Sequence, residues 1–107
     1  MATLAAVAVI AVLVSVTGAV AAVGSAVLAR HRAQAAADLA ALAAAGRLAE
    51  GLGSACGHAD SVAGAMGVAL ADCQVDGLDV VVAVEAPVGL GVWNVGPAHA
   101  AARAGPV

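Results

Sequence analysis

The sequence predicts an α+β fold in which one long N-terminal helix carries a small head. Residues 2–29 contain no charged side chain, and twelve of them are Val, Leu or Ile. No proline interrupts the helix-forming residues that follow this run. After residue 54, a short helical pattern gives way to an alternating pattern with an Asp-Gly turn signal. We therefore expect a lollipop: a transmembrane helix, its continuation, a second short helix and a two- to three-stranded antiparallel sheet.

Residues 2–29 are the expected transmembrane part of the first helix. Their Val, Leu and Ile side chains together favour insertion by about −4 to −7 kcal/mol, more than the few Ser, Thr and Gly residues cost. At about 1.5 Å per residue the run spans about 40 Å, enough for a hydrocarbon core of about 30 Å. The run is longer than a signal peptide needs, and no Lys or Arg precedes it. We expect an uncleaved anchor, with cleavage after Arg32 as the alternative.

Residues 30–50 are the expected continuation of this helix beyond the membrane, so that the whole helix runs from about residue 3 to Glu50. Leu39 and Leu42 begin an apolar stripe at three- and four-residue steps, and we expect this stripe to cover the head. Asp38 precedes the stripe and is either a solvated side chain or a contact to a neighbouring subunit.

Small residues inside the span recur every fourth position. Such a ridge permits close approach of a second helix, although small residues are frequent throughout this chain, which has 33 alanines. The candidate helix-packing residues are Gly18, Ala22, Ala26, Asp38, Leu39 and Leu42.

Residues 54–107 are the expected head. A second helix is predicted over about 55–66, capped by Ser54 and ended by Gly67. The sequence Val-Asp-Gly-Leu at 75–78 predicts a hairpin whose two turn residues are Asp76 and Gly77.

The register of this hairpin follows from its turn. It places Cys73 opposite Val80 and puts the apolar side chains of both strands on one buried face. Residues 88–96 have the composition of a glycine-rich apolar loop containing Trp93. Residues 98–104 alternate and suggest a third, edge strand, with a short helix as the alternative.

Cys56 and Cys73 are the two cysteines, 17 positions apart. The helix travels about 15 Å away from the first and the strand returns by the second, so the sulfurs come within reach of a disulfide. Such a bridge would stabilise the small head by about 3 kcal/mol and implies an oxidising compartment. The alternative is two free, buried cysteines. Zinc binding with His58 lacks a fourth ligand at usable spacing.

Composition argues against several functions. The net charge is −3 with four scattered arginines, which disfavours nucleic-acid binding. No spacing of Ser, His and Asp, no phosphate-binding glycine loop and no carboxylate pair indicates catalysis. We expect no catalytic residue, no metal site and no cofactor.

The orientation in the membrane receives conflicting signals. Arg30, His31 and Arg32 follow the span, and the positive-inside rule places them in the cytoplasm. The expected disulfide places the head outside the plasma membrane. We expect a single-pass protein with an extracytoplasmic head, and a short basic leader before Met1 would reconcile the two signals.

The residues after the span resemble a known family. The run from Arg30 to Ala43, containing Gln-Ala-Ala-Ala-Asp-Leu, resembles the TadE/TadG-like proteins of tight-adherence, Flp-type pilus systems. The two cysteines and the terminal Ala-Arg-Ala-Gly-Pro at 102–106 are similar to a small actinobacterial TadE-like subfamily, usually encoded near pilus or type II/IV secretion components.

The resemblance implies a non-enzymatic, pseudopilin-like subunit with an extracytoplasmic head. Its expected partners are the membrane, other pilus or secretion subunits, and further copies of itself. The alternative is a membrane-anchored interaction or regulatory module of another envelope complex.

Overall fold

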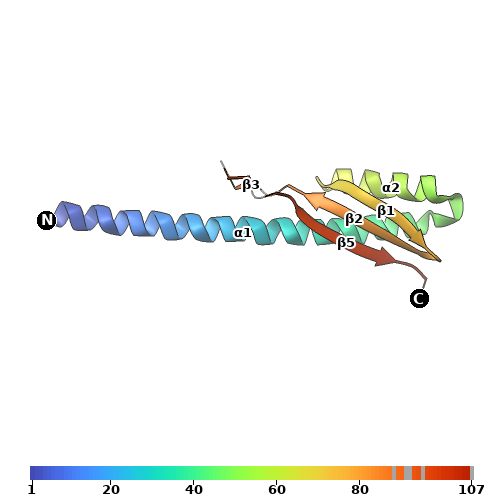
Figure 1. Cartoon of the computed structure of the whole chain (residues 1–107), viewed down its shortest axis with the longest axis horizontal. Helices are drawn as coiled ribbons and strands as arrows, with labels where there is room; N and C mark the ends of the chain where they lie inside the picture. The colour runs from blue at the N-terminus through green and yellow to red at the C-terminus, as the bar shows by residue number, and fades with distance from the viewer. Residues whose placement is uncertain (88, 91–92, 95, 107) are drawn as a thin grey trace.

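The computed structural model, which describes residues 1–87, 89–90, 93–94 and 96–106, has the predicted α+β lollipop architecture (Figure 1). A long helix, a 3₁₀ turn and a short helix are followed by five strands. Their bounds are α1 (Ala2–Gly46), η1 (Leu48–Glu50), α2 (Leu52–Ala65), β1 (Ala69–Asp76), β2 (Asp79–Ala86), β3 (Gly89–Leu90), β4 (Trp93–Asn94) and β5 (Ala98–Ala104). The molecule measures 74 × 26 × 17 Å because the first half of α1 extends away from the head.

The junction between the two helices differs from the prediction. α1 ends at Gly46 rather than at Glu50, and α2 begins at Leu52, three residues before the predicted start. Gly51 makes this turn possible because its φ of 110° lies in the left-handed region that glycine tolerates. Ser54 is not the cap of α2, because the helix begins at Leu52 and Gly51 occupies the cap position. The hydroxyl of Ser54 instead donates a hydrogen bond to the carboxylate of Glu50 (2.9 Å).

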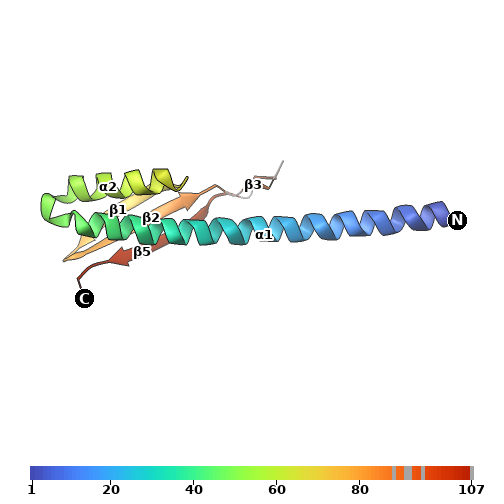
Figure 2. The ribbon, with the colours of Figure 1, turned by 180° about the vertical axis from the view of Figure 1, so that it is seen from behind.

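The main sheet is antiparallel, with strand order β1-β2-β5. Figures 1 and 2, seen from opposite sides, show that α1 and α2 both cover the same face of this sheet. The prediction of a strand over residues 98–104 is confirmed by β5. The predicted apolar loop contains a separate two-stranded hairpin, β3–β4; its positions 88, 91–92 and 95 lie outside the described residues.

The turn between β1 and β2 lies one residue later than predicted. Asp76 pairs with Asp79, so Gly77 and Leu78 are the turn residues, and Cys73 lies opposite Val82 rather than Val80. Gly77 supplies the left-handed conformation, with a φ of 64°. Pairing the two aspartates brings both carboxylates to Arg103 on β5. The shift moves each partner by two positions, which leaves the predicted buried face of β2 unchanged.

A bulge in β1 corrects the prediction at the other end of this strand. The register shifts between Leu70 and Asp72, and this irregularity turns the half-buried Leu70 toward the helices. Ala69 and Ala71, which the regular register placed inside, are exposed. The sheet thus gains contact area by burying the larger side chain.

The core lies between the helices and the sheet and is built from very small residues. In the part of the chain that the structure describes, the buried core residues are eleven alanines and four valines. Alanines at three- and four-residue steps on α1 let the helix approach the sheet closely; they are Ala33, Ala36, Ala37, Ala40, Ala41 and Ala44. The prediction that Leu39 and Leu42 cover the head is wrong, since they are 49% and 62% exposed.

Candidate assembly surfaces

The first half of α1 is an uncovered apolar surface. All of its large apolar side chains from Leu4 to Leu28 are exposed in the isolated chain. By length and composition, α1 is the one helix among the described residues that is able to cross a membrane. An apolar surface of this size needs lipid or protein to cover it.

The small residues of the span differ in exposure: Gly18 is exposed, whereas Ala22 and Ala26 are partly covered. Outside its own stretch of helix, no atom of the described residues lies within 4 Å of the position that a Cβ at Gly18 would occupy. Ala22 and Ala26 are half-buried, whereas every residue before Ala22 is exposed. At steps of three and four residues, Ala22 leads through Ala26 and Ala29 to the buried Ala33, so the same face of α1 continues into the head.

Asp38 lies on the exposed surface of α1 and has a partner on its own helix. The side-chain amide of Gln34 donates one hydrogen bond to Asp38 Oδ1 (3.2 Å) and another to the backbone oxygen of Ala101 in β5 (3.4 Å). Gln34 therefore connects the helix, the acid and the edge strand of the sheet. In the sequence Gln34 is part of the Gln-Ala-Ala-Ala-Asp-Leu motif, and its role depends on β5 lying beside α1, which no sequence pattern indicates.

A shallow groove of about 350 Å³ lies where α1 meets the end of β5. Asp38 and Leu42 line it from the helix, and Arg103, Ala104 and Gly105 line it from the strand. The structure thus brings two of the predicted helix-packing residues together with the conspicuous C-terminal tail. Leu39 is exposed on the same stretch of α1.

Arg103 is the centre of an ion-pair cluster at this end of the sheet. Its Nε donates to Asp79 Oδ2 (2.7 Å), and one terminal nitrogen donates to Asp76 Oδ2 (2.5 Å). The hydrogen bonds with Asp79 and then Asp76 raise the pKa of Arg103 above its ordinary value. A Cβ at Gly105 would collide with the carboxylate of Asp79, so glycine leaves the room that this ion pair occupies.

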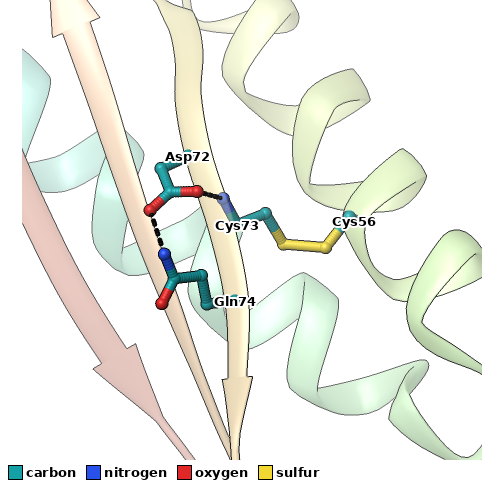
Figure 3. The surroundings of a disulfide bond; sticks show 4 residues. All are labelled: Cys56, Asp72, Cys73 and Gln74. Carbon is teal, nitrogen blue, oxygen red and sulfur yellow. Dashed lines mark hydrogen bonds between the residues drawn. A yellow bond between two sulfur atoms is a disulfide. The ribbon is translucent and has the colours of Figure 1, made fainter.

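The disulfide joins α2 to β1, as predicted. Cys56 and Cys73 are bonded, and their Cα atoms are 5.9 Å apart. Figure 3 shows Cys73 directed at the helix, with its neighbours Asp72 and Gln74 on the other side of the strand. Asp72 accepts hydrogen bonds from the backbone N–H of Cys73 (2.9 Å) and from the side chain of Gln74 (2.7 Å). These bonds hold the strand next to its bulge.

Other polar side chains are arranged in simple surface pairs. His99 Nδ1 lies 3.4 Å from a carboxylate oxygen of Glu85 across the sheet. Across residues 1–87, 89–90, 93–94 and 96–106, no three His, Cys, Asp or Glu side chains are grouped so that they could hold a metal ion.

Comparison with known proteins gives two matches. Residues 1–47 match the family described as putative Flp pilus-assembly TadE/G-like. A Mycobacterium tuberculosis protein named Apoptosis inhibitor Rv3654c is 65% identical over 54 residues, which make up 50% of this chain and 64% of that protein. The match therefore spans less than two thirds of the relative's length. No solved structure matches this chain.

The family match covers α1 and its end, which is the segment that carries the apolar span and the Gln-Ala-Ala-Ala-Asp-Leu motif. The resemblance seen in the sequence is therefore confirmed for this segment. Over residues 1–47 this chain is similar to the putative Flp pilus-assembly TadE/G-like family.

Proposed function

We propose that this chain is a non-enzymatic, membrane-anchored subunit of a tight-adherence pilus or of a type II/IV secretion-type assembly. One observation carries the proposal: the segment that matches the pilus-assembly family is also the long helix whose large apolar side chains from Leu4 to Leu28 are exposed. Residues 2–29 cross the plasma membrane once, residues 30–46 continue α1 beyond it, and α2 and the sheet form the head.

The head lies outside the plasma membrane. The disulfide between Cys56 and Cys73 supports this side, because disulfides persist in oxidising compartments and are rare in the cytosol. The test is thiol labelling in intact cells with a membrane-impermeant maleimide. We expect labelling only after an impermeant reductant is added. Labelling without reductant by a probe confined to the cytosol would overturn both the orientation and the oxidised state.

The subunit acts by helix–helix association, as pseudopilins do. Gly18 offers a site for close approach within the span, because no other element among the described residues occupies the space beside it. Above the membrane, Leu39 and Leu42 are large apolar side chains that face water in the isolated chain. Burying each leucine against a neighbouring helix would gain about 1.5–3 kcal/mol at most. Asp38 at the same groove gives the contact a polar rim.

The association is tested by co-purification from native membranes. The variants Leu39→Glu and Leu42→Glu place a charge on the proposed contact, and we expect each to lose the pilus or secretion subunits that the native chain retains. Leu52→Glu is the matched control, because Leu52 is 52% exposed at the start of α2 and does not line this groove. Equal recovery of these subunits with all three variants, or none with the native chain, would contradict the proposal.

A second function is suggested by the relative named as an apoptosis inhibitor, with which this chain shares 65% identity over half its length. A role outside the cell would require release of the head by cleavage, for example near Ala35. Ala33 and Ala36 are buried against the head, so cleavage there would cut through the core. Mass spectrometry of culture supernatant distinguishes the two functions, because only a released head yields a soluble fragment lacking the span.

A further inference from the structure

The hairpin β3–β4 lies in a stretch that the function described above leaves unused. Residues 86–98 carry no charged side chain and lie between Glu85 and His99. They contain Trp93, the single aromatic residue of the chain. A stretch of thirteen residues without a charged side chain is a candidate for contact with a less polar medium than water.

The position of this hairpin follows from how β5 lies along α1. His99 and Ala100, at the start of β5, share a groove with Arg30 and His31. Further along, Ala101 accepts the hydrogen bond from Gln34, and the end of the strand meets Leu42. The strand and the helix therefore run in the same direction. The chain that precedes β5 must accordingly extend toward the N-terminal, apolar part of α1.

Contacts with α1 show how far along that helix the hairpin lies. β3 contacts α1, and Figures 1 and 2 both show it beyond the sheet, along the helix on the side of the N-terminus. The first half-buried residues of α1 are Ala22, Ala26 and Ala29, on one helix face. Ala22 lies about 10 Å below Ala29 at 1.5 Å per residue. The head thus reaches down beside the end of the uncharged run.

We infer that the β3–β4 hairpin is a second membrane contact, which enters the interfacial layer of the leaflet nearest the head. This inference rests on the proposed membrane span. A hydrocarbon core of about 30 Å needs about 20 helical residues, so about eight residues of the 28-residue run remain for the interfacial layer. The stretch 22–29, which contains the half-buried Ala22, Ala26 and Ala29, is of this size and ends directly before Arg30.

The lipid interface fits this hairpin better than water does. Tryptophan is enriched at membrane–water interfaces, because its ring is amphipathic. Residues 86–98 include no charged side chain, so no charge would lose its hydration when the hairpin enters the interfacial layer. The hairpin is also continuous with the apolar surface of α1 that the same membrane covers. Because α1 and the hairpin both contact the same leaflet, the distance of the head from the membrane and its rotation about the axis of α1 are both fixed.

The single tryptophan makes the inference testable with the full-length native chain. The protein is reconstituted into phosphatidylcholine vesicles that carry bromine either near the headgroup end or near the middle of the bilayer. We expect the Trp93 fluorescence to be blue-shifted, and to be quenched about twofold or more by the shallow bromine and less by the deep one.

Two variants calibrate the depth. Trp93→Phe combined with Val14→Trp moves the fluorophore into the span, and we expect stronger quenching by the deep bromine. Trp93→Phe combined with Leu78→Trp moves it to the exposed turn at the far end of the head, where we expect no quenching by either lipid.

The outcomes separate the inference from the proposed function. If the tryptophan at position 14 is quenched and the native Trp93 is not, the hairpin does not contact lipid and the inference is overturned while the span stands. If the tryptophan at position 14 is not quenched either, the proposed span fails and the inference fails with it. Shallow quenching of Trp93 alongside deep quenching at position 14 supports both.

Discussion

The disulfide between Cys56 and Cys73 is a covalent link between the second helix and the sheet of the head. Removing it by the double substitution Cys56→Ala and Cys73→Ala should destabilise the head strongly and leave the span of α1 unaffected. The bridge closes a loop between positions 17 apart and ties α2 to β1. The core that remains consists, among the described residues, of eleven alanines and four valines.

The magnitude follows from the loop that the bridge closes. A loop of this length reduces the entropy of the unfolded chain by an amount equivalent to about 3 kcal/mol. Small domains rarely have more than about 3–5 kcal/mol of net stability, so the bridge supplies a large share. For hydrogen exchange through opening of the head, about 3 kcal/mol corresponds to a loss of protection of about a hundredfold.

The assay is hydrogen exchange followed by mass spectrometry on the full-length chain in detergent micelles. Peptides from β2 should lose about two orders of magnitude of protection, because Val80, Val82 and Val84 lie at the centre of the sheet and are fully buried. Peptides from the first half of α1 should exchange as before, since the micelle and not the head protects them.

Reduction of the native protein provides the control. Treating the native chain with a reductant should reproduce the change, whereas the same treatment of the double variant should change nothing. Unchanged protection of β2 in both the reduced protein and the variant would refute the reasoning, because it would mean that alanine and valine packing alone holds the head closed.

Three further predictions concern single side chains. Val82→Ala should lower the free energy of unfolding by about 2–3 kcal/mol, because it removes buried surface and leaves a cavity. Val81→Ala, on the other face of β2, should lower it by less than half of that. Equal losses in the two variants would contradict the assigned inner face. Gly105→Ala should displace the side chain of Asp79, so the Arg103 side-chain NMR signal should shift and broaden; an unaltered signal would disprove the collision. Hydrogen bonds from Ser54 and then Arg47 lower the pKa of Glu50, so its carboxyl should titrate below 4.5 by NMR, and its stabilising effect should be complete above that pH and lost as the pH falls through the lowered value. A Glu50 titration at or above 4.5 would show that these bonds do not persist in solution.

The long-range organisation of this fold was predictable because it depends on strong, repeated signals. The uncharged run, the helix that follows, the two cysteines and the alternation over residues 98–104 each predicted an element that the structure contains. A disulfide also tolerates small errors of register. The pairing of Cys73 was wrong by two positions, but both registers place its sulfur on the side of α2.

Local details depended on interactions that no sequence pattern contains. The turn lies one residue later than predicted because Asp76 and Asp79 meet Arg103, which is more than twenty positions away. The choice of the inner face of α1 was wrong for a related reason. Hydrophobicity favoured Leu39 and Leu42 as the buried stripe, whereas close packing against a sheet selected the alanines, whose small side chains allow the backbones to approach.

The unbroken course of α1 has a mechanical consequence. Its 45 residues form one helix about 67 Å long, with neither a proline nor an irregular turn inside it. A helix without a hinge transmits force along its axis as a stiff rod does. Any machine that lifts the span along the membrane normal would therefore raise the head by the same distance, at the same moment, without a separate conformational change in the head.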